Sequence, residues 1–212
     1  MKFRAVDRTA LALPLLLACS AAERHPEPPG SSCGDGSVSS SATTGAYSPA
    51  AIAESACGAV ITEEPLDEPL HVEACTPITY ATNPPSSGRH YSDWADFTIF
   101  EEPVARGYWV HSLEHGAVVI AYSCADCEEE IAAARSLLDE LPEDPLCGLR
   151  GAEKPNRAIL TPDPLLDVPW AAAAWGYTLR SECFEPHVFR DFALARLGLG
   201  PENFCAAGAV TP

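Results

Sequence analysis

The sequence contains a single methionine, Met1, and no glycine-rich phosphate-binding motif of the GxGxxG or P-loop type. This methionine is the initiator, which we expect to be removed, so a thioether-rich copper(I) site cannot form. Without a phosphate-binding loop, nothing indicates a nucleotide ligand. Long apolar runs are also missing: the longest in the body of the chain, residues 117–122, has the length of a strand, whereas a transmembrane helix needs roughly 20 residues.

Basic residues are scarce. The 212 residues include 13 Lys and Arg against 30 Asp and Glu, a formal net charge of −17. Such a surface repels phosphate backbones, and no basic patch offsets it, so we expect no nucleic-acid partner. Diffuse negative charge attracts cations without selectivity, and it indicates mainly solubility.

The N-terminus has the pattern of an export signal. Three basic residues fall among the first eight, and a short apolar run follows over residues 10–18. The run ends Leu16-Leu17-Ala18-Cys19, which resembles the bacterial lipobox. We therefore predict a lipoprotein signal peptide over residues 1–18, with lipid attached to Cys19. The alternative is an ordinary secretory signal with an incidental cysteine.

The signal predicts where the protein resides. Two or three acyl chains hold a protein firmly on a membrane, so we expect a lipid-anchored protein of the cell envelope. Ser20 follows the cysteine, which by resemblance to Gram-negative sorting favours the outer membrane. Residues 19–55, rich in Ser, Ala, Gly and Pro, are predicted to be a flexible tether. Residues 56–212 then form a single globular domain. Protein partners are not indicated.

Cysteines are plentiful for an exported domain. Besides Cys19 there are eight, an even number that predicts up to four disulfides in an oxidising compartment, with the pairing left open. Two of them form the sequence Cys124-Ala125-Asp126-Cys127, between an apolar strand and an acidic helix start. This CxxC arrangement suits a structural disulfide, a redox-active pair or zinc ligation. The acidic neighbours disfavour a reactive thiolate.

Hydrophobic patterning predicts an α+β fold. Residues 108–122 are interpreted as one or two strands, and residues 157–160 and 170–179 as further strands. Helical spacing and end signals predict helices over residues 128–141 and 186–197. Together these elements indicate a small, mostly antiparallel sheet with helices packed on one face, stapled by disulfides.

Four histidines in the first half of the domain, His71, His90, His111 and His115, are candidate metal ligands, because neutral imidazole binds zinc and copper. On a strand, His111 and His115 would lie about 13 Å apart, so they share one ion only if the chain turns between them. The alternative is that each histidine simply hydrogen-bonds to the backbone or to a carboxylate. A strand context also lacks the helical HExxH arrangement of zinc proteases.

Three segments carry a family resemblance: NPPSSGRHY at residues 83–91, VHSLEHGAVVI at residues 110–120 and AWG at residues 174–176. They resemble the domain-of-unknown-function family 3105, a group of exported, often membrane-anchored bacterial proteins, over about residues 71–202. The family motif has proline where Arg89 stands, which puts the loop's shape in doubt. The resemblance supplies no activity, but it implies one site formed by His71, His90, His111, Glu114 and His115.

The sequence therefore predicts an exported, lipid-anchored domain that binds copper or zinc through its histidine cluster. A thiol–disulfide oxidoreductase using Cys124 and Cys127 is the main alternative, and a non-catalytic envelope interaction module is another. Whether the protein is an enzyme stays open.

Overall fold

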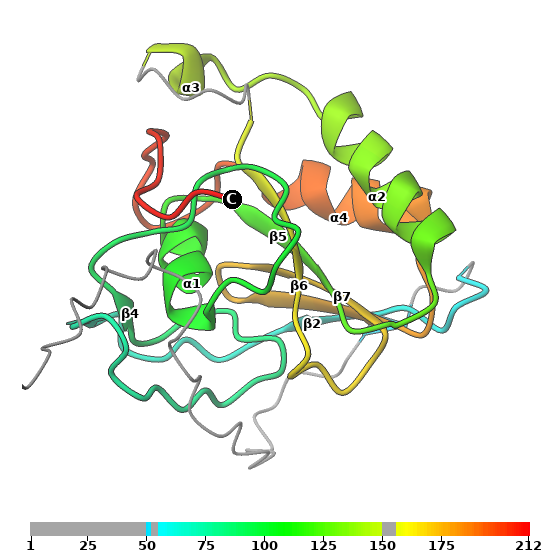
Figure 1. The fold of residues 1–212 in the computed structure, drawn as a ribbon, viewed down its shortest axis with the longest axis horizontal. Helices are drawn as coiled ribbons and strands as arrows, with labels where there is room; N and C mark the ends of the chain where they lie inside the picture. The colour runs from blue at the N-terminus through cyan, green and yellow to red at the C-terminus, as the bar shows by residue number, and fades with distance from the viewer. Residues whose placement is uncertain (1–49, 52–54, 150–155) are drawn as a thin grey trace, which may run out of the picture.

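The computed structural model describes residues 50–51, 55–149 and 156–212 (Figure 1). The predicted signal peptide, Cys19 and most of the predicted tether lie outside these residues. Within the described part of the chain, no helix is long and apolar enough to cross a bilayer.

A six-stranded sheet forms the centre of the domain. Its strand order is β1-β2-β8-β7-β5-β6, with the bounds β1 Ala50–Ala51, β2 Val60–Glu63, β5 Val118–Tyr122, β6 Ala158–Pro162, β7 Trp170–Ala174 and β8 Tyr177–Ser181. The pair β5–β6 is parallel and the other pairs are antiparallel. A separate two-stranded parallel sheet joins β3 His71–Val72 to β4 His90–Tyr91. Strand β1 lies within the stretch that the sequence predicted as tether.

Both faces of the central sheet are covered. Every residue of β5 and β7 is buried, and successive side chains of a strand point to opposite faces. Val119 and Ala121 join the apolar cluster around α1 Arg106–Glu114, whereas Val118 and Ile120 join the cluster around α2 Glu128–Glu140 and α4 Pro186–Arg196. Figure 1 shows α2 and α4 together on one side of the sheet and α1 on the other. The predicted α+β class is confirmed, and α1 adds a helix on the second face.

Helices α2 and α4 match the two predicted helices to within one residue at each end. Helix α2 buries Ala134, Leu137 and Leu138 and exposes most of its charged residues, the one-sided pattern that makes a surface helix recognisable. A short helix, α3 Pro145–Leu149, follows α2.

The prediction of strand over residues 108–122 is wrong in its first half. Residues 106–114 form α1, and all nine are buried. A helix buried all round shows no apolar stripe, and the aromatic and β-branched residues Tyr108, Trp109 and Val110 imitate a strand. Gly116 follows with a φ of +87°, in the left-handed region where glycine commonly ends a helix. Only then does the chain extend into β5.

Disulfides staple the domain as predicted. Cys57 pairs with Cys183, Cys124 with Cys127, and Cys147 with Cys205. Cys75 is also disulfide-bonded. The widest of the three described bridges joins residues 126 apart in sequence and links the start of the domain to the segment before α4.

Candidate metal centre

Four of the predicted ligands converge. His71 and His90 stand directly opposite each other on β3 and β4, and His111 and Glu114 lie one turn apart on α1. One donor atom from each residue lies within 4.8 Å of the donor atoms of the other three. Among the described residues this is the group of His, Cys, Asp and Glu side chains with the spacing of a metal site.

Close packing of β4 on α1 brings the two halves of this cluster together. The ring of Tyr91, the residue after His90, packs against Gly107 near the start of the helix. A Cβ at Gly107 would lie 2.6 Å from the Tyr91 ring, which is too short for any side chain. Glycine at this position therefore lets β4 approach the helix.

The three imidazoles of the cluster form a near-equilateral triangle. Ring centroids are 4.7 Å apart for His71–His90, 4.8 Å for His71–His111 and 4.7 Å for His90–His111. Donors on one tetrahedral zinc are about 3.4 Å apart, given metal–nitrogen bonds of about 2.0–2.1 Å. The donor atoms of the cluster, which lie within 4.8 Å of one another, would therefore draw closer together on binding one ion.

Hydrogen bonds to the backbone fix two of the rings. His90 Nδ1 lies 2.8 Å from the Gly88 carbonyl, and His111 Nδ1 lies 2.7 Å from the Tyr91 carbonyl. A carbonyl oxygen only accepts, so each Nδ1 carries the hydrogen and donates it. The neutral ring then has a bare lone pair on Nε2. Metal-binding histidines are commonly oriented by this kind of outer hydrogen bond.

Burial keeps these rings in the ligand-competent neutral form. Desolvation lowers the pKa of both His90 and His111, and the neighbouring histidines lower it further. The hydrogen bonds to backbone carbonyls act in the opposite direction but are the smaller effect.

The contact between His90 and Glu114 is the most informative in the cluster. His90 Nε2 lies 3.0 Å from Glu114 Oε2, yet within the described part of the chain this buried nitrogen has no hydrogen-bond partner. A bare imidazole nitrogen and a carboxylate oxygen are both acceptors, so a proton on Glu114 or a cation is needed between them. Burial raises the pKa of Glu114, and the charge of Glu202 raises it further.

His115, the fifth predicted ligand, lies beside the cluster. It caps the C-terminus of α1, and its ring centroid is 4.5 Å from that of His111. The chain therefore turns between these two histidines, and the separation of about 13 Å that a strand would give does not apply. Its Nε2 faces Glu202 at 3.4 Å, and Trp94 and Phe204 pack on the ring. Burial lowers the pKa of His115 to about 3.

The sequence signal for a helical site was present in residues 111–115, whose order is H-x-x-E-H. That order occurs on helices of inverted zinc proteases. Here, however, Glu114 belongs to the donor cluster and His115 faces Glu202. The arrangement differs from one in which both histidines bind the ion and the glutamate acts as base.

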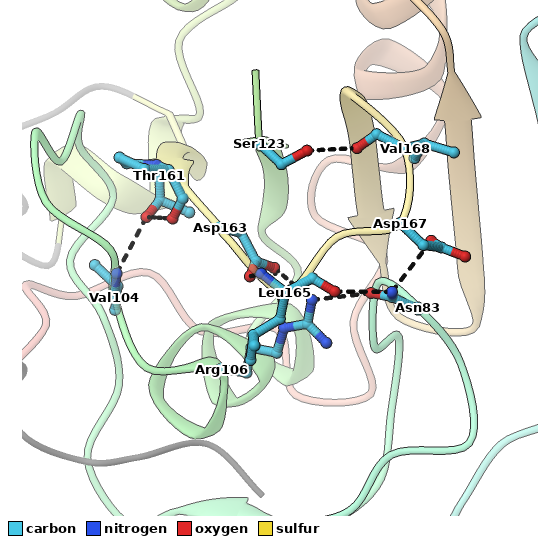
Figure 2. A network of polar contacts seen from close by, with 10 residues as sticks. Asn83, Val104, Arg106, Ser123, Thr161, Asp163, Leu165, Asp167 and Val168 are labelled. Atoms are coloured by element: carbon cyan, nitrogen blue, oxygen red, sulfur yellow. Dashed lines mark hydrogen bonds and ion pairs between the residues drawn. The ribbon is translucent and has the colours of Figure 1, made fainter. Parts of the chain in front are cut away.

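A polar network around the buried Arg106–Asp163 ion pair, which the sequence did not reveal, connects segments that carry the cluster (Figure 2). The Arg106 guanidinium, at the start of α1, donates to Asp163 at 2.8–2.9 Å and to Asn83 Oδ1 at 2.9 Å. Asn83 in turn donates to the Leu165 carbonyl and to Asp167. Because Asn83 begins the loop that ends at His90, the network ties that loop to the helix carrying His111.

The second predicted site, the Cys124–Cys127 pair, is not an open group of ligands like the histidine–glutamate cluster. Cys124 and Cys127 form a disulfide at the junction of β5 and α2, with Cys127 buried at the N-cap and Cys124 half-buried. Glu128, Glu129 and Glu130 occupy the first turn of α2. Both sulfurs are engaged with each other, so neither is available as a metal ligand in this state.

Fold and cluster together define a disulfide-bonded α+β domain with a histidine–glutamate centre beside its buried helix. The family model described as "Protein of unknown function (DUF3105)" matches residues 71–205. The match spans more than half of the chain, and the chain belongs to this family. All four residues of the cluster lie within the matched span. Comparison with curated proteins and with solved structures finds no match.

Proposed function

We propose that this chain is an exported, lipid-anchored protein that binds one zinc or copper(II) ion through His71, His90, His111 and Glu114. The observation that supports this most is the buried pair of acceptors, His90 Nε2 and Glu114 Oε2, 3.0 Å apart. A divalent cation between them satisfies both lone pairs at once. His90 and His111 donate from Nδ1 to backbone carbonyls, and these hydrogen bonds orient both rings before an ion binds.

The donor set selects the class of metal. Three imidazole nitrogens and one carboxylate oxygen suit zinc or copper(II), and the cluster contains no thioether to favour copper(I). Four protein donors also fill a tetrahedral site, whereas catalytic zinc keeps a position open for water. Binding or handling of the ion is therefore favoured over hydrolysis.

Metal content tests the proposal directly. The mature chain is expressed into an oxidising periplasm, purified without chelator or histidine tag, and titrated with zinc and with copper(II). We expect about one equivalent, and a loss of affinity of at least about 100-fold in His90→Ala and in His111→Ala. His187→Ala is the matched control, because His187 is exposed on α4, outside the cluster. Full stoichiometry and affinity in both cluster variants would overturn the proposal.

Membrane anchoring rests on the lipobox and is tested separately. Cys19→Ala removes the thiol that receives the lipid, so the protein is expected to leave the membrane fraction of fractionated cells. Metal binding by the mature domain is expected to be unchanged. Retention of the variant in the membrane fraction would contradict the anchor.

Thiol–disulfide exchange is the second candidate function. The CxxC disulfide at a helix N-terminus favours it, because the helix dipole stabilises a thiolate there. The three glutamates of the first turn oppose a thiolate by like-charge repulsion. This candidate requires that the pair exchange with a test disulfide under mild conditions. If the pair is inert and no metal binds, an interaction module without chemistry is the remaining hypothesis.

A further inference from the structure

The four proposed ligands differ sharply in exposure. The side chains of His90 and Glu114 are 1% and 8% exposed, and His111 is also buried, whereas the side chain of His71 is 52% exposed. Three donors therefore lie inside the domain, and the fourth closes the cluster from the solvent side.

His71 is also the least constrained of the three imidazoles. Backbone carbonyls accept hydrogen bonds from His90 and His111, but no such bond holds the His71 ring among the residues described. Its Nε2 lies 3.9 Å from Glu114 Oε2, against 3.0 Å for His90. The ring can turn outward without breaking a hydrogen bond, and rotamer changes of exposed side chains take picoseconds to nanoseconds.

The backbone that follows His71 lies at the surface of the domain. Strand β3 has two residues and pairs with β4 within the described chain, and residues 73–77 after it are exposed. By contrast, β4 is buried against α1, and His111 lies within the fully buried helix. Rotation of the exposed His71 side chain therefore leaves the other three donors in place.

We propose that His71 is a displaceable ligand, so that the ion enters and leaves the centre by ligand exchange on this side. The inference rests on the proposed metal site. In the exchange, the bond from His71 Nε2 to the metal breaks as a nitrogen donor of imidazole type from an outside carrier bonds to the same ion. No electron is transferred, and the charge of the ion is unchanged. His90, His111 and Glu114 hold the ion during the exchange.

This proposal separates His71 from the buried ligands by kinetics. Protein loaded with copper(II) is mixed with excess chelator, and release is followed by the recovery of tryptophan fluorescence. Trp94 and Trp175 are suitable reporters, since their rings lie 5.4 Å from His111 and 6.4 Å from His90. We expect His71→Ala still to take up about one equivalent, but to release it at least about 10-fold faster. Millimolar free imidazole should bind the opened position of His71→Ala, shift the copper(II) absorption band and slow release again.

Three outcomes would overturn the displaceable ligand. Loss of the ion in His71→Ala as complete as in His90→Ala makes His71 a permanent ligand. Unchanged affinity and release make it no ligand at all. A variant that releases the ion faster but shows no spectral response to imidazole has no exchangeable position. Absence of metal from the wild-type protein is a different result, because it removes the proposed function itself. His187→Ala controls for general effects of losing an imidazole.

Discussion

The histidine–glutamate cluster and the Cys124–Cys127 pair lie at opposite ends of the same strand. Strand β5 leaves α1 at Gly116 and reaches Cys124 just after Tyr122. Both groups consist of residue types that bind metals, yet the bonds that their potential ligand atoms already make are different. The two sulfurs are bonded to each other, whereas His90 Nε2 and Glu114 Oε2 face each other as acceptors. Residue type alone therefore does not identify a metal site. What identifies it is a group of ligand atoms that converge and have lone pairs not yet used in other bonds.

Electrostatics separates the two groups further. Near Cys127 the helix dipole favours negative charge, but three glutamates already occupy the first turn of α2. Around His90 and His111, burial lowers the pKa of each ring and keeps the nitrogens neutral. The first environment suits a disulfide that stays closed, and the second suits a cation.

Removal of disulfides should show the largest effect. By the loop-entropy relation, a bridge between residues 3 apart contributes about 2 kcal/mol, and one between residues 126 apart contributes about 5 kcal/mol. We therefore expect Cys124→Ser/Cys127→Ser to lower the free energy of unfolding much less than Cys57→Ser/Cys183→Ser, as measured by urea denaturation. Metal affinity should be unchanged in the first variant. A large loss of metal affinity in that variant would show that the disulfide and the cluster are coupled and do not act independently.

Arg106→Ala tests whether the buried Arg106–Asp163 ion pair and its network support the fold. The substitution leaves Asp163 as an uncompensated buried carboxylate, which typically destabilises a protein by about 3–5 kcal/mol. Arg135→Ala is the control, because its ion pair with Glu101 lies on the surface and such pairs contribute about 0–1 kcal/mol. Thermal unfolding of both variants gives the comparison. Equal, small shifts would show that the network does not support the fold.

Gly107→Ala addresses the packing of β4 on α1. Its Cβ would lie 2.6 Å from the Tyr91 ring, and overpacking of this kind destabilises a protein by about 1–3 kcal/mol. Because the Tyr91 carbonyl orients His111, metal affinity should fall as well. Gly148→Ala, where no atom lies within 4 Å of the new Cβ, is the matched control. Chemical denaturation and metal titration of the two variants give the comparison. If Gly107→Ala behaved like Gly148→Ala, the contact between β4 and α1 would be able to adjust to the added methyl group.

Much of the fold was predictable because its surface elements carry one-sided patterns. Helices α2 and α4 show apolar stripes and recognisable ends, and β5 is a continuous apolar run. Helix α1 could not be recognised in the same way. It is buried on every side, so no period distinguishes a helix from a strand over this segment.

The cluster was predictable in composition but not in geometry. His71, His90, His111 and Glu114 were among the expected ligands, because their residue types and the family motifs single them out. The separation of His115 from the group depends on helical geometry and on Glu202, almost 90 residues away in the sequence. Arg106 gave no signal, since its buried ion pair with Asp163 depends on tertiary packing alone. Asn83 begins one of the family motifs, but its contact with Arg106 depends on the same packing.

Of these substitutions, we expect Glu114→Gln to change stability least. It also tests most directly whether the cluster, unlike the Cys124–Cys127 pair, has lone pairs available for a cation. In the metal-free protein, the new amide can donate to His90 Nε2, which lies 3.0 Å from the carboxylate and has no hydrogen-bond partner among the described residues. A hydrogen bond contributes about 0.5–1.5 kcal/mol, so the free energy of unfolding should stay equal or rise. Metal affinity should nevertheless fall by at least about 10-fold, because a neutral amide oxygen replaces an anionic ligand.

Urea denaturation of the metal-free variant and competition with a chelator measure the two quantities separately. A fall in metal affinity without a fall in the free energy of unfolding is expected only if Glu114 serves to bind a cation and does not stabilise the fold. If stability and affinity fell together, the carboxylate would be a structural partner of His90. If the affinity did not change, Glu114 would lie outside the ligand set, and the pair of facing acceptors would need a proton as its only explanation. Glu101→Gln, on the surface beside Arg135, should leave metal affinity unchanged and so controls for the loss of one negative charge.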